Sequence, residues 1–239
     1  FELHYQPQLR VEGGELAGAE ALIRWNHPTK GLISPLDFIP LAEDTGLIVP
    51  IGEWIVRRVC QQIVQWDREG NYIPRVSINV AGPQLDQDNF VSYMKGCLDS
   101  YGLSASRLEV EITETYIMQQ GDRAIDAQNG LKELGLELAI DDFGTGYSSL
   151  AHLKRLPIST LKIDRSFVCD TPDDANDVAI VKAILAMAAT LQLTVVAEGV
   201  ETPEQRELLE QNGCDILQGY LFSRPLPALE FISYVNSLD

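Results

Sequence analysis

The chain has few basic residues relative to its acidic ones. Lysine and arginine number 18 against 35 aspartates and glutamates, which gives a formal net charge of −17 over 239 residues. A surface this acidic repels a phosphate polymer, which argues against a nucleic-acid partner. A phosphate-containing ligand would therefore need bound cations at its site.

Cysteines and long hydrophobic runs are also scarce. Four cysteines lie far apart, with no C-x-x-C pair and no histidine at zinc-finger spacing: Cys60, Cys97, Cys169 and Cys214. We expect four buried thiols in a reducing compartment. No run approaches the ~18 apolar residues of a membrane span, and no charged-then-apolar leader opens the chain. These absences predict a cytoplasmic domain without membrane contact, and leave open a membrane anchor elsewhere in a full-length protein.

Strand-like and helix-like segments alternate along the chain. A hairpin turns at Gly13 and Gly14, and residues 48–69 carry the i, i+3, i+4 apolar spacing of an amphipathic helix. Further strands are predicted at 75–80, 107–112, 136–141, 159–163, 193–198 and 215–218, and helices around 84–100, 120–134, 147–155, 174–191, 203–212 and 227–238. This alternation favours one (β/α)8 barrel over an open doubly wound sheet. The lack of G-x-G-x-x-G after the first strands weakens a dinucleotide-binding alternative.

Polar residues stand at the ends of the predicted strands, where a barrel of this type gathers its functional groups. They are Glu20, Asn79, Glu111, Asp141, Asp142, Lys162, Glu198 and Gln218. Each carboxylate alone is better explained as a turn residue or a helix cap. Several carboxylates on one rim would repel one another unless cations neutralised them, so the set as a whole predicts a metal site.

The donor types indicate which metal. His4, His27 and His152 have no mutual spacing suited to metal binding, whereas oxygen ligands suit Mg²⁺ or Mn²⁺. The adjacent Asp141 and Asp142 suggest two ions, which can clamp a phosphoryl group between them.

Lys162 has three interpretations at this stage: a Schiff-base lysine, a cation that orients phosphate or water, and a structural partner of Asp164. The carboxylates at the same rim should raise its pKa, which disfavours Schiff-base chemistry.

Ordered blocks of the sequence resemble the EAL domain family, phosphodiesterases that degrade the bacterial second messenger cyclic di-GMP. The signature Glu20-Ala21-Leu22 stands within E-A-L-x-R-W, and the later blocks include EITE, DDFGTG, LKID, AEGVET and QGY. The resemblance covers essentially the whole chain and implies a single domain, 1–239, with a modified TIM-type (β/α)8 barrel and one antiparallel strand near the N-terminus. We expect this domain to be excised from a larger signalling protein with upstream sensory or GGDEF domains.

The resemblance also implies residue roles. The metal ligands would be Glu20, Asn79, Glu111, Asp141, Asp142, Glu198 and Gln218. The catalytic set would be Glu198 as general base, Lys162 orienting the attacking water, and Glu20. Substrate contacts would come from Gln6, Leu22, Arg24, Asp164, Glu201 and Pro225. Glu114 would brace the loop that contains Phe143, Gly144, Thr145 and Gly146.

The implied function is hydrolysis of cyclic di-GMP to linear pGpG by two-metal activation of water, carried out by a homodimer. One alternative is a catalytically inactive EAL domain that acts as a cyclic di-GMP receptor, and another is a metal-dependent barrel for a different substrate. Inactive members of the family typically lose the EAL glutamate or a metal acid, and none is lost here. One departure is Ala81, where the family usually has serine, which predicts a less firmly oriented Asn79 and weaker metal affinity.

Overall fold

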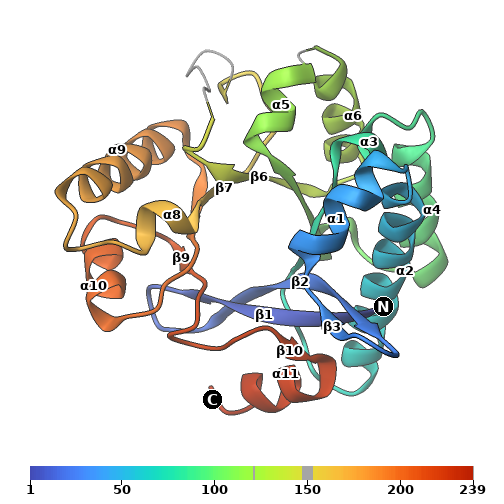
Figure 1. Cartoon of the computed structure of the whole chain (residues 1–239), viewed down its shortest axis with the longest axis horizontal. Coiled ribbons are helices and arrows are strands. Elements are labelled where there is room, and N and C mark those ends of the chain that lie inside the picture. Colours follow the sequence, from blue (N-terminus) through green and yellow to red (C-terminus); the bar gives the residue numbers. More distant parts are fainter. Residues whose placement is uncertain (121, 147–152, 239) are drawn as a thin grey trace.

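The computed structural model describes residues 1–120, 122–146 and 153–238. Eight strands close into a barrel in the order β1-β9-β8-β7-β6-β5-β4-β2, with β1 pairing back onto β2, and helices surround it (Figure 1). The ring strands are β1 (Glu2–Arg10), β2 (Leu16–His27), β4 (Val76–Asn79), β5 (Leu108–Thr113), β6 (Glu137–Phe143), β7 (Thr160–Ile163), β8 (Thr194–Ala197) and β9 (Ile216–Leu217). The predicted barrel is confirmed.

Strand β1 is the antiparallel member of the ring. It runs antiparallel to β2 and β9, whereas the pairs from β2 through β4 to β9 are parallel. The hairpin places Gly13 and Gly14 at φ of 82° and 71°, a region that glycine adopts without a steric cost. Two short strands lie outside the ring: β3 (Gly31–Ile33) pairs with β2, and β10 (Leu226–Pro227) pairs with β1.

The described helices are α1 (Pro35–Asp44), α2 (Ile48–Arg68), α3 (Gly82–Leu85), α4 (Phe90–Tyr101), α5 (Glu114–Gln120), α6 (Asp122–Glu133), α8 (Arg165–Val168), α9 (Ala175–Leu191), α10 (Pro203–Gln211) and α11 (Ala228–Val235). The helix predicted at 84–100 is two helices, because Asn89 leaves the helical backbone region at φ −96°, ψ 1°. Helix α1 is absent from the prediction although its start carries the usual signals, Ser34 as N-cap and Pro35 in the first turn. Most of the helix predicted at 147–155 lies outside the described residues.

The hydrophobic core fills the space between the barrel wall and the helices. Tyr5 of β1 meets Trp66 of α2 and Phe231 of α11, with ring centroids 4.8 and 5.9 Å apart. Cys60, Cys97 and Cys214 are buried, as predicted. The prediction is wrong for Cys169, which is exposed because it follows α8 at a solvent-facing turn.

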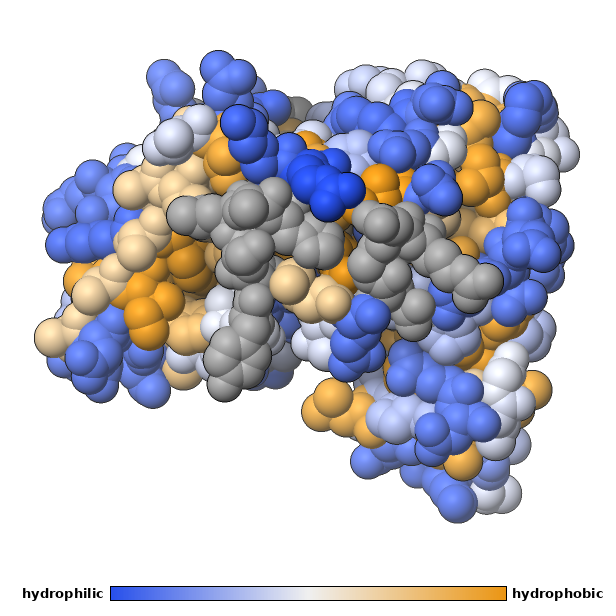
Figure 2. Space-filling model, turned by 90° about the horizontal axis from the view of Figure 1, so that it is seen from above, coloured by the Kyte–Doolittle hydropathy of each residue, from blue (hydrophilic) through white to orange (hydrophobic). Residues whose placement is uncertain are grey.

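The surface carries both hydrophilic and apolar side chains. The face shown in Figure 2 is mostly hydrophilic, with apolar side chains in separate patches. In the part of the chain that the structure describes, no helix combines the length and apolar character needed to cross a bilayer.

Candidate active site

Lys162 forms the centre of the polar site inside the barrel. Its side chain is 1% exposed, and Nζ lies 2.6 Å from carboxylate oxygens of both Glu111 and Glu198. Asp141 lies 3.1 Å away and Glu20 lies 3.5 Å away. Five strand ends therefore meet at one ammonium group. Asp164 is not among these partners, so the interpretation of Lys162 as a partner of Asp164 receives no support.

A layer of amides holds Glu20 from the other side. Asn79 Nδ2 donates to Glu20 Oε1 at 2.6 Å, and Gln218 Nε2 donates to Glu20 Oε2 at 2.6 Å. Gln218 also donates to Gln6 Oε1 at 3.1 Å and accepts from Gln8 Nε2 at 2.9 Å. Both glutamines of β1 point into the barrel because Gln6 pairs with Glu20 in the antiparallel register. Glu20 is thus fixed through both of its oxygens.

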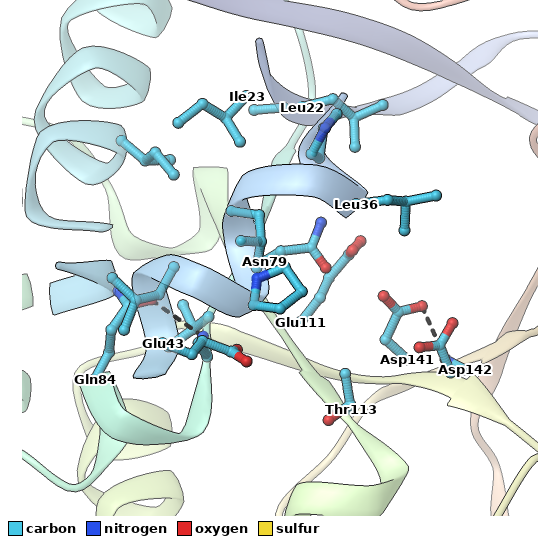
Figure 3. Close-up of a pocket in the computed structure, with 18 of the residues that line it drawn as sticks. Leu22, Ile23, Leu36, Glu43, Asn79, Gln84, Glu111, Thr113, Asp141 and Asp142 are labelled. Carbon is cyan, nitrogen blue, oxygen red and sulfur yellow. Dashed lines mark hydrogen bonds between the residues drawn. The ribbon is translucent and has the colours of Figure 1, made fainter. Parts of the chain in front are cut away.

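Asp141 and Asp142 end strand β6 side by side. The Asp142 N–H donates to Asp141 Oδ1 at 3.0 Å, and Asp142 adopts φ of 55°, which turns its side chain toward the same space as Asp141 (Figure 3). A positive φ is costly for a residue other than glycine, and such strain is common at functional sites. Asp141, Asp142 and Glu198 each offer a carboxylate oxygen within 4.8 Å of the others.

The charges of the site shift the pKa values of its members in different directions. Although burial acts to lower the pKa of Lys162, the surrounding carboxylates raise it well above its usual value, as predicted. Burial acts to raise the pKa of Glu20, yet the Lys162 ammonium and the donors from Gln218 and Asn79 lower it overall. Glu20 is consequently held as an anion by its neighbours.

The other acids shift the opposite way. Burial raises the pKa of Glu198 to about 8, despite the attraction of Lys162. Burial and the charges of Asp141 and Asp164 raise the pKa of Asp142 to about 6. Burial and the charge of Glu20 raise the pKa of Glu111 well above its usual value. One ammonium does not neutralise this many carboxylates.

The donor set fits divalent cations. Glu111 is 1% exposed, and its Oε1 has no hydrogen-bond partner, which leaves a buried oxygen whose need for a partner a cation could meet. Carboxylate and amide oxygens are the ligands that Mg²⁺ and Mn²⁺ prefer. Glu20, Asn79, Glu111, Asp141, Asp142 and Glu198 could hold such ions, whereas both polar ends of the Gln218 amide are already engaged by protein groups.

The residues around Asn79 show how the Ala81 departure is accommodated. The Ala81 N–H donates to Gln84 Oε1 at 3.1 Å, and Asn79 is oriented by its bond to Glu20 alone among the described contacts. No described residue therefore supplies Asn79 with the hydrogen bond that a serine hydroxyl at position 81 could give.

Glu114 contacts the backbone of the loop that follows β6. Its Oε2 accepts from the Gly144 N–H at 2.8 Å and from the Gly146 N–H at 3.1 Å. Thr145 Oγ1 donates to the Asp142 carbonyl at 2.8 Å, and Phe143 is buried. Gly144 has φ of 101° and lies against the Phe167 ring, where a Cβ would come within 2.7 Å of a ring carbon. These contacts tie the loop position to Asp142; residues 147–149 of the predicted loop lie outside the described residues.

Two cavities open at this end of the barrel and share Leu22, Asn79 and Asp141 in their walls. The first measures about 390 Å³ and runs between the acids and helix α1, with Leu36, Glu43 and Gln84 along it (Figure 3). Arg24 lines this cavity and donates to the Ile23 carbonyl at 2.9 Å; burial lowers its pKa. The second measures about 280 Å³ and is lined by Gln6, Glu20, Glu198, Glu201 and Gln218, among others.

Two of the predicted substrate residues line neither cavity, although Asp164 lies close enough to Asp142 to raise the pKa of that carboxyl. Asp164 caps α8, accepting from the Ser166 N–H at 3.0 Å and from the Ser166 hydroxyl, and lines neither cavity. The Pro225 carbonyl accepts from His4 Nδ1 at 3.3 Å, and Pro225 also lines neither cavity.

The sequence prediction misses several residues of the site, among them Gln8, Arg165 and Tyr220, and also Leu36, Glu43 and Gln84 of the first cavity. The position of Gln8 two residues after Gln6 on one strand was the available signal.

Comparison with known proteins identifies the family. A family model of the EAL domain matches residues 1–225. The chain is 49% identical over 227 residues, 95% of its length, to cyclic di-GMP phosphodiesterase NbdA of Pseudomonas aeruginosa, and covers 29% of that protein. It is 45% identical over 233 residues, 98% of its length, to bifunctional diguanylate cyclase/cyclic di-GMP phosphodiesterase MucR of the same organism, and covers 34% of it. The chain thus spans about a third of the length of these curated relatives.

A solved structure of a relative has the same fold. A PaMucR phosphodiesterase in complex with c-di-GMP superposes with a TM-score of 0.92 at 45% identity, covering 96% of this chain and 93% of that chain. The fold, the matched residues and the identity to these relatives show that this chain belongs to the EAL domain family.

Proposed function

We propose that this domain hydrolyses one phosphodiester bond of cyclic di-GMP to give linear pGpG, with Mg²⁺ or Mn²⁺, and with two ions at the site. The observation that carries the proposal is the convergence of Glu20, Glu111, Asp141 and Glu198 on Lys162, with Asn79 bonded to Glu20. The names of NbdA and MucR, and the c-di-GMP complex of PaMucR, support this choice of substrate.

Bound divalent ions would supply positive charge that polarises the phosphoryl group and stabilises the charge that develops on its oxygens. The residues of the chain perform the remaining tasks. Glu198, which lines the second cavity beside the other acids, accepts the proton of the attacking water as general base. Lys162, whose ammonium lies within 2.6 to 3.5 Å of four carboxylates, would orient that water through its positive charge. The water then attacks phosphorus in line with the ribose 3′ oxygen. The bond between phosphorus and that oxygen breaks, and the 3′ oxygen leaves as a hydroxyl after taking a proton from solvent, so that the linear product carries a 5′ phosphate.

Arg24 binds a phosphate of the substrate from the wall of the first cavity, where five N–H donors suit phosphate oxygens. Leu22 and Leu36 offer apolar surface beside it for a nucleotide base. Gln6 and Glu201 present amide and carboxylate groups to the second cavity. The two cavities together extend on both sides of the acids.

The direct test is chromatography of cyclic di-GMP incubated with the purified domain and Mg²⁺ or Mn²⁺. We expect pGpG to form, EDTA to stop its formation, and Glu20→Gln to reduce the rate by about 100-fold or more, because one carboxylate of the cation site is lost. Binding of cyclic di-GMP without any pGpG would identify an inactive receptor instead. Hydrolysis of other phosphodiesters at rates unaffected by Arg24→Ala would favour a different substrate.

We also propose that the domain acts as a homodimer within a longer cytoplasmic signalling protein, with sensory or GGDEF domains preceding it. The name of MucR, which pairs both activities in one protein, supports the GGDEF arrangement. Light scattering of the purified domain tests the dimer: a single species of about 53 kDa, twice the 26.5 kDa chain, is expected.

A further inference from the structure

Arg165 is a cation of the site that neither the sequence motifs nor the proposed mechanism uses. It opens α8, directly after the Asp164 cap, and lines the second cavity together with Glu198 and Tyr220. Helices α1 and α8 lie on opposite sides of the barrel opening (Figure 1); residues of α1 line the first cavity, and Arg165 of α8 lines the second.

The backbone beside Arg165 makes room for its side chain. Gly199 has φ of 68°, and a Cβ at this position would come within 2.2 Å of Arg165 Cγ and 2.8 Å of Arg165 Cβ. Any larger residue at position 199 would displace the arginine. The stem of Arg165 is therefore set against the strand end that carries Glu198.

The guanidinium group is held by one edge only. Arg165 Nη2 lies 2.9 Å from Glu201 Oε1, and the side chain remains 58% exposed. Among the described residues no other ion pair engages it, so part of its fork of five donors stays available at the mouth of the cavity. Such a planar fork binds the oxygens of a phosphate or a carboxylate in a bidentate manner.

The charges of the cavity walls point to the same ligand. Of the described residues that line the two cavities, Arg24 is the cation of the first and Arg165 is the cation of the second, and the other charged lining residues are acidic. The walls shared by the cavities contain Asp141, a proposed ligand of the ions that would hold the reacting phosphate. A cyclic dinucleotide has a second phosphate, which must lie outside that position.

We propose that Arg165 binds the second phosphate of the cyclic dinucleotide, the one that is not cleaved, with its free edge while Glu201 holds the other edge. This inference rests on the proposed function. It makes Arg165 a residue that selects a ligand with two phosphates over a ligand with one.

The test compares Arg165→Ala, Arg165→Lys and the wild-type domain with two probes, cyclic di-GMP and cyclic GMP. KM and kcat for cyclic di-GMP are measured with Mg²⁺ or Mn²⁺, and equilibrium binding of both probes is measured with the same ions in a Glu198→Gln background, where loss of the proposed general base keeps turnover slow. Arg68→Ala, an exposed arginine of α2 outside both cavities, is the matched control for the loss of a positive charge.

We expect Arg165→Ala to raise KM and the dissociation constant for cyclic di-GMP about tenfold, the loss expected for one charge-assisted hydrogen bond at a partly exposed site. Its kcat should stay within about twofold, and its affinity for cyclic GMP should not change. Arg165→Lys should recover part of the loss, because it keeps the charge without the fork. Arg68→Ala should leave all values unchanged.

Equal weakening of both probes, or no weakening of cyclic di-GMP binding, would overturn the role of Arg165. A fall in kcat at unchanged KM would overturn it as well, since the residue would then act on the chemical step. These results are separable from failure of the proposed function, which is a wild-type domain that forms no pGpG. Equilibrium binding in the presence of the ions still decides the Arg165 question in that case. A wild-type domain that neither binds nor hydrolyses cyclic di-GMP would refute both.

Discussion

Replacement of Lys162 by methionine tests how strongly the buried carboxylates of the site depend on its positive charge. Methionine fills a similar volume but removes the ammonium that lies within 2.6 to 3.5 Å of four carboxylates. Removing one partner of a buried ion pair typically costs about 3–5 kcal/mol, because the remaining charge is left without compensation. We expect a loss of this size in the free energy of unfolding at pH 8, measured by urea denaturation in EDTA.

The loss should depend on pH, with a sign set by Glu198. Its pKa rises from 4.5 to about 8 on folding, so the folded state binds more protons than the unfolded state between these values. Stability in EDTA therefore falls as pH increases through this window. Lys162 stays charged throughout, because its folded pKa lies well above 10.5. Without the ammonium the carboxyls protonate more readily, so the difference between Lys162→Met and wild type should be smaller at pH 5 than at pH 8.

Added cations should partly replace the missing charge. Mg²⁺ binds the folded state and stabilises it by mass action, and the more negative site of the variant should gain more from it than the wild type. Lys95→Met is the control, since Lys95 pairs with Asp99 at 2.7 Å on the surface of α4, with exposed fractions of 60% and 65%; its effect should stay below about 1 kcal/mol. A Lys162→Met variant as stable as the Lys95→Met control at pH 8 would refute the account of the site as a charge cluster held by Lys162.

Three further outcomes are expected. Glu114→Ala removes the acceptor of two loop N–H groups and should lower kcat for cyclic di-GMP at least about tenfold, with Glu114→Gln intermediate; unchanged activity in both would show that the loop does not need this residue. Ala81→Ser should tighten the apparent affinity for Mg²⁺ or Mn²⁺ by up to about tenfold by restoring a donor near Asn79, and equal metal titrations of the two forms would contradict this. A thiol-reagent titration at pH 8 should find one fast cysteine, Cys169, because burial raises the pKa of Cys60 and Cys214 to about 12; the fast phase should disappear in Cys169→Ser, and further fast thiols in the native protein would be inconsistent with the core.

Local patterns in the sequence determine much of the fold. The amphipathic spacing of residues 48–69 and the glycine after it correspond to α2 (Ile48–Arg68), because packing of one helix face depends on residues a few positions apart. The predicted strand ends correspond to the rim of the barrel, because parallel strands place their carboxyl ends at the same edge. The acids at these ends are local features, so the order of residues along the chain is enough to identify them.

Other features depend on residues that are distant in the chain. Glu20 is bonded by Gln218, 198 positions away, and Lys162 contacts Glu111, 51 positions away, so neither the lowered pKa of Glu20 nor the raised pKa of Lys162 follows from a sequence window. The alternation of apolar and polar residues over residues 2–10 indicates a strand. Closure of the ring, however, decides that Gln6 and Gln8 of this strand are buried and that both are hydrogen-bonded to Gln218. Arg165 and Glu201 become neighbours only because β7 and β8 pair in parallel. The sequence alone thus determined which chemical groups are present and on which elements they lie, whereas the tertiary structure decided their pairing and charge state, because burial and Coulomb interactions depend on distance through space.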